Sequence, residues 1–210
     1  MSRLFLVRHA AVDTAGRYWS ATDLPLSSEG VEQLPVLVQR LANEHLAAIY
    51  ASDRARARRS AVAMAKHRSC AVELDERLRE IDFGSCEGLT FNEIASRWPD
   101  VADSLVSAPT SFVAPGGESF VQFTSRVNQF VRERLTAIDS NIVVVAHRGT
   151  LGVIAAGLLG RPPDETLRWP FPPGEMKVLN RPAHGQSFGE PADRSAVPAW
   201  TLGETPTTGR

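Results

Sequence analysis

Two apolar runs of the chain each end in a histidine that stands beside an arginine. Residues 4–9 read LFLVRH, and residues 142–147 read IVVVAH and are followed by Arg148. A neutral imidazole can act as a covalent nucleophile, and the planar guanidinium of an arginine can bind the oxygens of an anion. A single histidine at the end of such a run usually has a structural role, held by hydrogen bonds. Two of them, each beside an arginine, indicate a functional site built on Arg8, His9 and His147.

The position of these residues along the chain predicts where they meet. Short apolar runs that stop at charged groups are typical of buried strands in a parallel sheet. Ligands of such proteins bind in the crevice beyond the carboxyl ends of the strands. We therefore expect Arg8, His9 and His147 to converge on one pocket, with an anion bound among them.

Strand-like and helix-like segments alternate along the rest of the chain. Further strands are expected at residues 47–52, 70–74 and 176–179. Helices are expected from Ser28, over 55–66, over 90–98, from Glu118 or Ser119, and over 150–159. This alternation predicts an α/β protein, a three-layer α/β/α sandwich with a mostly parallel central sheet.

Two of the predicted helices have clear apolar stripes. The helix from Ser28 is expected to bury Val31, Leu34, Val38 and Leu41, with Pro35 kinking or restarting it. The helix that opens at Glu118 or Ser119 is expected to bury a longer stripe, made of Phe120, Phe123, Val127, Phe130, Val131 and Leu135.

Composition narrows the class of protein. The 210 residues are 43% apolar and 22% charged, which predicts one globular domain over residues 1–180 followed by an extended tail over 181–210 that Trp200 anchors. The net charge of −1 favours neither nucleic acid nor an anionic membrane as partner, and the apolar runs are too short to span a bilayer. Cys70 and Cys86 form no CxxC pair and no secretory signal is evident, which favours the cytoplasm.

Several blocks of sequence together resemble one enzyme family. LFLVRHA is similar to the Arg-His-Gly signature of the histidine phosphatase superfamily, the phosphoglycerate-mutase-like enzymes. Further blocks match in the same order, over about residues 3–160: GRYWSATDLPLSSEGVEQ from Gly16, YASDRARARRSA from Tyr50, LREIDFGSCEG from Leu78, PGGES from Pro115 and VVVAHRGT from Val143. The resemblance implies a phosphoglycerate-mutase-like fold for residues 1–180.

The resemblance also implies roles for the cationic and imidazole side chains. His9 is the expected nucleophile, which would pass through a phosphohistidine, while Arg8, Arg56 and His147 would bind the phosphoryl oxygens. Arg56, rather than Arg54, matches the catalytic arginine of the family block. The arginines at 54, 58 and 59 are interpreted as a solvated helix face.

An acid must deliver a proton to the leaving oxygen of a phosphate monoester. Glu80 matches the position of the proton donor in the family, and Asp82 and Glu87 are acidic neighbours that compete for the role. Glu87 is expected to brace the loop before Gly88. Glu118 is expected to open a helix and to act as a structural ligand.

Some positions depart from the usual pattern of the family. Ala10 replaces the usual glycine, Val12 and Ala15 replace polar phosphate ligands, and Arg148 replaces a small residue. The stretch from Gly16 to Leu26 resembles that of α-ribazole phosphatases.

The predicted protein is a metal-independent phosphatase that needs no cofactor and acts on a small phosphorylated metabolite, with α-ribazole 5′-phosphate as one candidate. A phosphoglycerate mutase and a non-catalytic phosphate-binding protein are the alternatives, and the oligomeric state stays open.

Overall fold

Six strands form one sheet, in the order β3-β2-β4-β1-β5-β6, in the computed structural model, which describes residues 2–135, 139–181 and 200–207. The strands are β1 (Arg3–Arg8), β2 (Leu46–Ala51), β3 (Val72–Leu74), β4 (Asn141–Ala146), β5 (Met176–Asn180) and β6 (Thr201–Gly203). Pairing is parallel from β3 through β2 and β4 to β1, and antiparallel between β1 and β5 and between β5 and β6. The prediction of a mostly parallel sheet is confirmed.

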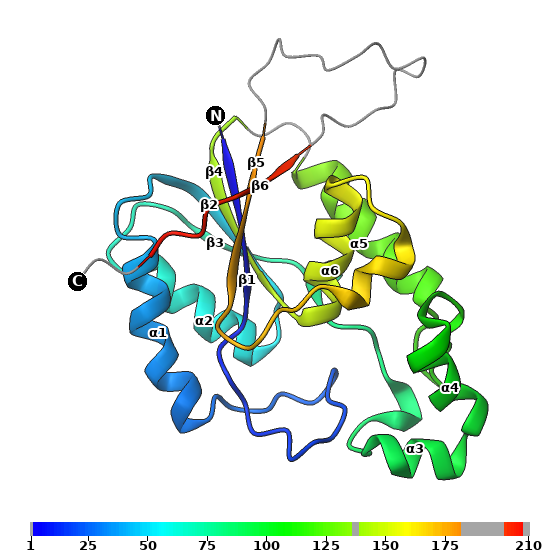
Figure 1. Cartoon of the computed structure of the whole chain (residues 1–210). Coiled ribbons are helices and arrows are strands. Elements are labelled where there is room, and N and C mark those ends of the chain that lie inside the picture. Colours follow the sequence, from blue (N-terminus) through cyan, green and yellow to red (C-terminus); the bar gives the residue numbers. More distant parts are fainter. Residues whose placement is uncertain (1, 136–138, 182–199, 208–210) are drawn as a thin grey trace, which may run out of the picture.

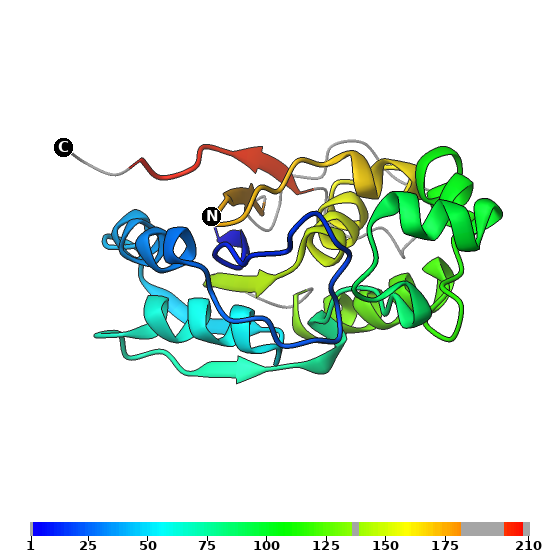
Figure 2. The ribbon, with the colours of Figure 1, turned by 90° about the horizontal axis from the view of Figure 1, so that it is seen from below.

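Helices cover both faces of this sheet (Figures 1 and 2). The α-helices are α1 (Ser28–Arg40), α2 (Ala55–Ala65), α3 (Phe91–Arg97), α4 (Pro99–Ser107), α5 (Phe120–Arg134) and α6 (Arg148–Leu158). Short 3₁₀ helices lie at Glu76–Leu78, Gly84–Cys86, Pro109–Ser111 and Pro163–Arg168. No helix of the described residues is long and apolar enough to cross a membrane.

The layers follow from the alternation of side chains along the strands. In β1, Leu4 and Leu6 belong to a core that includes side chains of α5 and α6, whereas Phe5 and Val7 belong to a second core with side chains of α1 and α2. These four apolar side chains of β1 are fully buried. The predicted three-layer α/β/α sandwich is therefore confirmed.

The pairing of β1 with β4 decides what the edge of the sheet presents. Arg8 lies opposite Ala146, and the backbone N–H of His9 donates to the Ala146 carbonyl at 3.0 Å. Both strands run toward the lower edge of the sheet in Figure 1, the edge that faces the viewer in Figure 2. Because the strands are parallel neighbours in this register, the residues after them, His9 and His147, lie side by side.

The predicted stripe of α5 is confirmed. All six of its apolar side chains are buried: Phe120, Phe123, Val127, Phe130, Val131 and Leu135. Ser119, one of the two predicted openings, is the N-cap, since its hydroxyl accepts from the Gln122 N–H and the Gln122 side chain accepts in return from the Ser119 N–H.

The predicted face of α1 is confirmed in part. Leu41 is buried and Val38 packs, partly buried, against the same core, whereas Val31 is 43% exposed and the helix buries Gly30 and Leu37 instead. The reason is a close backbone approach, because a Cβ at position 30 would lie 2.1 Å from the Ala11 carbonyl oxygen. Only glycine allows this contact, and it turns the Gly30 side of the helix toward the sheet.

Several element ends differ from their predictions. Ser27, not Ser28, caps α1, which continues through Pro35 as one helix. Helix α6 begins at Arg148 rather than 150, because His147 is already its N-cap. Helix α4 was not predicted, although Pro99 at its first position is a typical start signal.

The predicted tail, residues 181–210, lies mostly outside the described residues. Where it is described, Trp200 is buried in the core and Thr201–Gly203 pair with β5 as strand β6.

Candidate active site

His9 and His147 lie in contact at the carboxyl edge of the sheet. Their ring centroids are 5.1 Å apart, with 62° between the ring planes, and both side chains are almost fully buried. The two histidines that sequence analysis predicted to converge, 138 positions apart, are therefore neighbours in the structure.

The hydrogen bonding of His9 determines which ring nitrogen is available. Its Nδ1 lies 2.8 Å from the Ala10 carbonyl oxygen. A carbonyl only accepts hydrogen bonds, so we assign the ring proton to Nδ1. The neutral ring then has its lone pair on Nε2, where a nucleophile needs it.

The surroundings of His9 favour this neutral form. The pKa of His9 is lowered to about 3. Burial is the largest cause, the charges of Arg56 and Arg8 add to it, and the hydrogen bond to Ala10 opposes it. At neutral pH the imidazole is therefore uncharged and able to attack an electrophile.

This lowered pKa makes the stability of the fold dependent on pH. Between pH 6.5 and about 3 the unfolded chain binds more protons than the folded one, so the free energy of unfolding falls as the pH drops. For His9 alone we expect a loss of about 2 kcal/mol between about pH 7.5 and pH 5. Urea titrations in phosphate-free buffer should show the stability of His9→Gln approaching that of the wild type as the pH falls. Stability curves that stay parallel would contradict this prediction.

His147 is held by a residue that sequence analysis missed. Its Nε2 lies 3.0 Å from the Ser52 hydroxyl oxygen, and both side chains are buried. Burial is the largest cause that lowers the pKa of His147 well below 6.5, followed by His9, Arg56 and Arg8. Ser52 directly follows β2, the neighbour of β4, so its position at the end of a predicted strand was a usable signal.

Two arginines lie close enough to the histidines to affect their charge. Arg8 donates through Nη1 to the Phe171 carbonyl at 2.6 Å. Arg56 is 2% exposed and donates to the carbonyls of Ser20, at 3.0 Å, and Thr22, at 2.9 Å. Burial lowers the pKa of both guanidiniums, and the charge of Glu80 opposes the change. They remain cations at neutral pH, as an anion-binding role requires.

Among the described residues, four buried side-chain N–H groups have no acceptor, and two of them belong to arginines at this edge, the others to Arg40 and Trp200. The Nε–H groups of Arg8 and Arg54 are buried and have no hydrogen-bond acceptor in the part of the chain that the structure describes. Arg58 and Arg59 are exposed, but Arg54 is only half-exposed, and its charge lowers the pKa of His147. The prediction that Arg54 belongs to a solvated face is therefore corrected. Donors of this kind suit an anion that has several oxygens.

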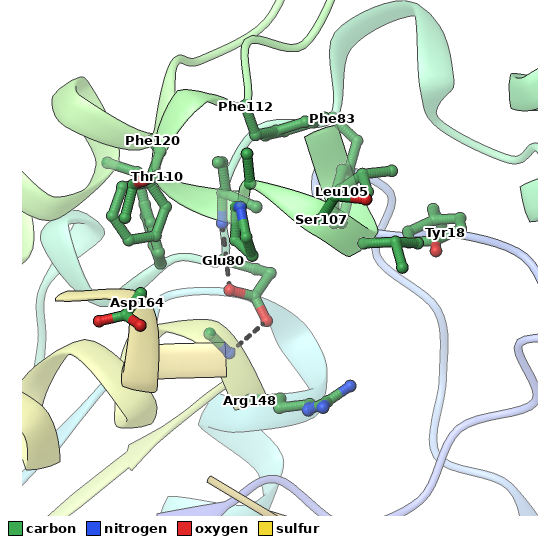
Figure 3. A pocket seen from close by; sticks show the side chains of 16 residues that line it. Tyr18, Glu80, Phe83, Leu105, Ser107, Thr110, Phe112, Phe120, Arg148 and Asp164 are labelled. Carbon is green, nitrogen blue, oxygen red and sulfur yellow. Dashed lines mark hydrogen bonds between the residues drawn. The ribbon is translucent and has the colours of Figure 1, made fainter. Parts of the chain in front are cut away.

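The Glu80 carboxylate is fixed by backbone donors. Its Oε2 accepts from the Gly149 N–H at 2.9 Å, in the first turn of α6, and its Oε1 accepts from the Ile81 N–H at 3.2 Å (Figure 3). Arg126 of α5 donates to the Glu80 carbonyl at 2.8 Å. Glu80 is thus held between the two helices that cover one face of the sheet.

The neighbouring acids have structural partners. Glu87 accepts from the N–H groups of Ser20 and Thr22 and from the Ser20 hydroxyl. Burial would raise the pKa of Glu87, but these hydrogen bonds outweigh burial and lower it. Glu87 therefore has a structural role, as predicted, but the loop that it braces is 20–22, whose carbonyls bind Arg56, and not only its own loop before Gly88.

Glu118 and Asp82 brace a second loop. Glu118 forms an ion pair with Arg126 at 2.7 Å and accepts from the Asp82 N–H. Asp82 is exposed and accepts from the Gly84 N–H at 2.9 Å. The prediction of Glu118 as a structural ligand agrees with these contacts.

The positions that depart from the family pattern have structural contacts. The Ala10 N–H donates to the buried Ser60 hydroxyl at 3.0 Å, and Val12 pairs with Leu26 in an isolated antiparallel bridge. Ala15 adopts a positive φ of 49° in the loop that follows.

Among residues 2–135, 139–181 and 200–207, no three His, Cys, Asp or Glu side chains form a group that could hold a metal ion.

Comparisons with known proteins find one superfamily and its fold. The model of the histidine phosphatase superfamily (branch 1) matches residues 4–193. Phosphoserine phosphatase 1 of Hydrogenobacter thermophilus is 33% identical over 81% of this chain and 82% of its own length. Glucosyl-3-phosphoglycerate phosphatase of Mycolicibacterium vanbaalenii is 31% identical over 90% and 88%. The crystal structure of the alpha-ribazole phosphatase from Shigella flexneri has the same fold, with a TM-score of 0.82, 22% identity and coverage of 98% and 96%.

Proposed function

The chain belongs to the histidine phosphatase superfamily, and we propose that it hydrolyses the monophosphate ester of a small metabolite through a phosphohistidine formed on His9. The protein is a phosphatase, like its relatives at 31% and 33% identity, although other relatives, at 27–29% identity, are named probable phosphoglycerate mutases. The observation that carries the proposal is the state of His9. Its imidazole is neutral, and the contact of Nδ1 with Ala10 leaves the lone pair on Nε2. The cations of Arg8 and Arg56 lie near enough to lower its pKa.

In the first step, His9 Nε2 attacks phosphorus and the bond from phosphorus to the ester oxygen breaks. Arg8 and Arg56 bind the phosphoryl oxygens and offset their negative charge, and His147 completes the set of groups around them. Glu80, in its protonated form, gives its proton to the departing alkoxide, which leaves as the alcohol.

In the second step, the Glu80 carboxylate removes a proton from a water molecule, which attacks the phosphorus of the phosphohistidine. The bond from nitrogen to phosphorus breaks, inorganic phosphate leaves and neutral His9 is restored. The same carboxyl group thus serves first as general acid and then as general base, which returns it to the protonated form that the next cycle requires.

Gly149 allows a test of how accurately Glu80 must be held. A Cβ at position 149 would lie 2.4 Å from Glu80 Oε1, so Gly149→Ala must push the carboxylate aside. We expect kcat/KM for an alkyl phosphate to fall by about 10²-fold, since displacements of about 1 Å have effects of that size. The free energy of unfolding should change by no more than about 1 kcal/mol, because the displaced atoms end a flexible side chain.

The same helix offers a matched control. A Cβ at Gly157 would lie 3.5 Å from Asn128 Oδ1, an ordinary contact. Gly157→Ala should therefore retain wild-type kcat/KM. Comparable losses in the two variants would attribute the effect to α6 as a whole and would contradict the assigned role of Glu80.

The proposed substrate is a small phosphorylated metabolite, with α-ribazole 5′-phosphate as the first candidate. Its support is the stretch from Gly16 to Leu26, which resembles that of α-ribazole phosphatases. The names of the relatives add phosphoserine and glucosyl-3-phosphoglycerate as esters to compare with it.

The function is tested by measuring phosphate release from a panel of monoesters with a chelator present, alongside an assay for the interconversion of phosphoglycerates. We expect phosphate release without added metal and no interconversion. Interconversion without phosphate release would assign a mutase, and binding of phosphate without turnover would assign a non-catalytic protein. Activity that disappears with the chelator and returns with a divalent metal would contradict metal independence.

A further inference from the structure

A cavity of about 540 Å³ opens beside the Glu80 carboxylate. The residues that line it include Glu80, Phe83, Val106, Phe112, Phe120 and Arg148. Figure 3 shows aromatic and aliphatic side chains on one side of Glu80 and Arg148 on the other. Phenylalanine rings pack against each other in this wall, with the centroids of Phe83 and Phe112 6.2 Å apart.

The cavity begins at the group that we propose protonates the leaving oxygen. Glu80 and its hydrogen-bond donor Gly149 both line it, and Gly149 is two residues beyond His147. An ester oxygen within reach of Glu80 would therefore adjoin this cavity. The alcohol part of the substrate, which is attached to that oxygen, can extend along the apolar walls.

A second hollow beside Glu80 is less suited to the alcohol part. It is lined mostly by charged side chains, and several of them already form ion pairs. Arg79 binds Asp53, and Arg126 binds Glu118 at 2.7 Å. A substrate group in this hollow would compete with these ion pairs.

We infer that the alcohol part of the substrate is a largely apolar group, of the size of one or two rings, and that it lies in this cavity. The inference rests on the proposed function, and it names the substrate class. Burying an apolar group against the phenylalanine rings is favourable, whereas a small zwitterion would lose hydration there.

The test compares kcat/KM for unbranched alkyl phosphates from ethyl to hexyl. Their leaving alkoxides are chemically alike, so differences in kcat/KM along the series report how well the alkyl chain is bound. We expect kcat/KM to rise by about threefold to fourfold for each added methylene that the cavity buries. Phosphoserine should be cleaved less efficiently than hexyl phosphate. A flat series, or a preference for phosphoserine, would overturn the inference.

Two exposed valines provide a variant and its matched control. Val106 lines the cavity and is 69% exposed, whereas Val121, on the first turn of α5, is 68% exposed and is not among the lining residues. Val106→Asp should flatten the dependence of kcat/KM on chain length and lower the value for hexyl phosphate by about tenfold. Val121→Asp should reproduce the wild-type series. Equal slopes in the two variants would overturn the inference.

The outcomes also distinguish the inference from the function beneath it. If short alkyl esters and p-nitrophenyl phosphate are hydrolysed through a phosphoenzyme but chain length has no effect, the proposed function stands and the apolar cavity is not the alcohol site. If no monoester is hydrolysed and no phosphoenzyme forms, both proposals fail.

Discussion

His9→Ala is expected to abolish turnover and the phosphoenzyme together, with kcat/KM reduced by at least about 10⁴-fold. The reason is the geometry of the two imidazoles. The hydrogen bond of His9 to Ala10 leaves Nε2 free, whereas the Nε2 of His147 already faces the Ser52 hydroxyl at 3.0 Å. His147 is therefore not arranged to replace the missing nucleophile.

The measurement is a rapid quench at alkaline pH, where phosphohistidine survives, after mixing with a labelled monoester. His45→Ala is the matched control, since His45 is exposed on the turn before β2. It should form phosphoenzyme and turn over at the wild-type rate. Phosphoenzyme in His9→Ala at the wild-type level would reject His9 as the nucleophile.

The convergence of the two histidines was predictable because it depends on one local pattern and one general rule. Apolar runs that end in histidine identify strand ends, and carboxyl ends of parallel strands share an edge. Arg56 required the family resemblance, because periodicity does not separate it from Arg54. The structure separates them by burial, since Arg56 is 2% exposed and Arg54 is half-exposed.

Contacts between distant segments were not predictable from the sequence. The Gly149 N–H that fixes Glu80 and the Arg126 side chain that holds its backbone come from α6 and α5. Neither contact has a signature in the residues near Glu80. The exposure of Val31 in α1 has the same kind of cause, because the approach of Gly30 to the Ala11 backbone places Gly30 in the interior.

Glu80→Gln is expected to affect esters according to their leaving groups. Glutamine retains the shape of the side chain but cannot supply the proton, so kcat/KM for an alkyl phosphate should fall by about 10²–10⁴-fold. The loss should be smallest for p-nitrophenyl phosphate, whose phenolate leaves without a proton. Because Glu80 would also activate the water, the second step should slow, and phosphohistidine should accumulate with the activated ester.

The comparison of the two esters separates chemistry from structural damage, since misfolding or a lost phosphate site would lower both rates alike. Asp82→Asn is a suitable control, because Asp82 is exposed and its carboxylate accepts from the Gly84 N–H. We expect this variant to keep the wild-type ratio of the two rates. Equal losses for both esters in Glu80→Gln would reject Glu80 as the proton donor and direct the search to Asp82 and Glu87. Of these two, Glu87 would require its hydrogen bonds to the 20–22 loop to break before it could donate a proton.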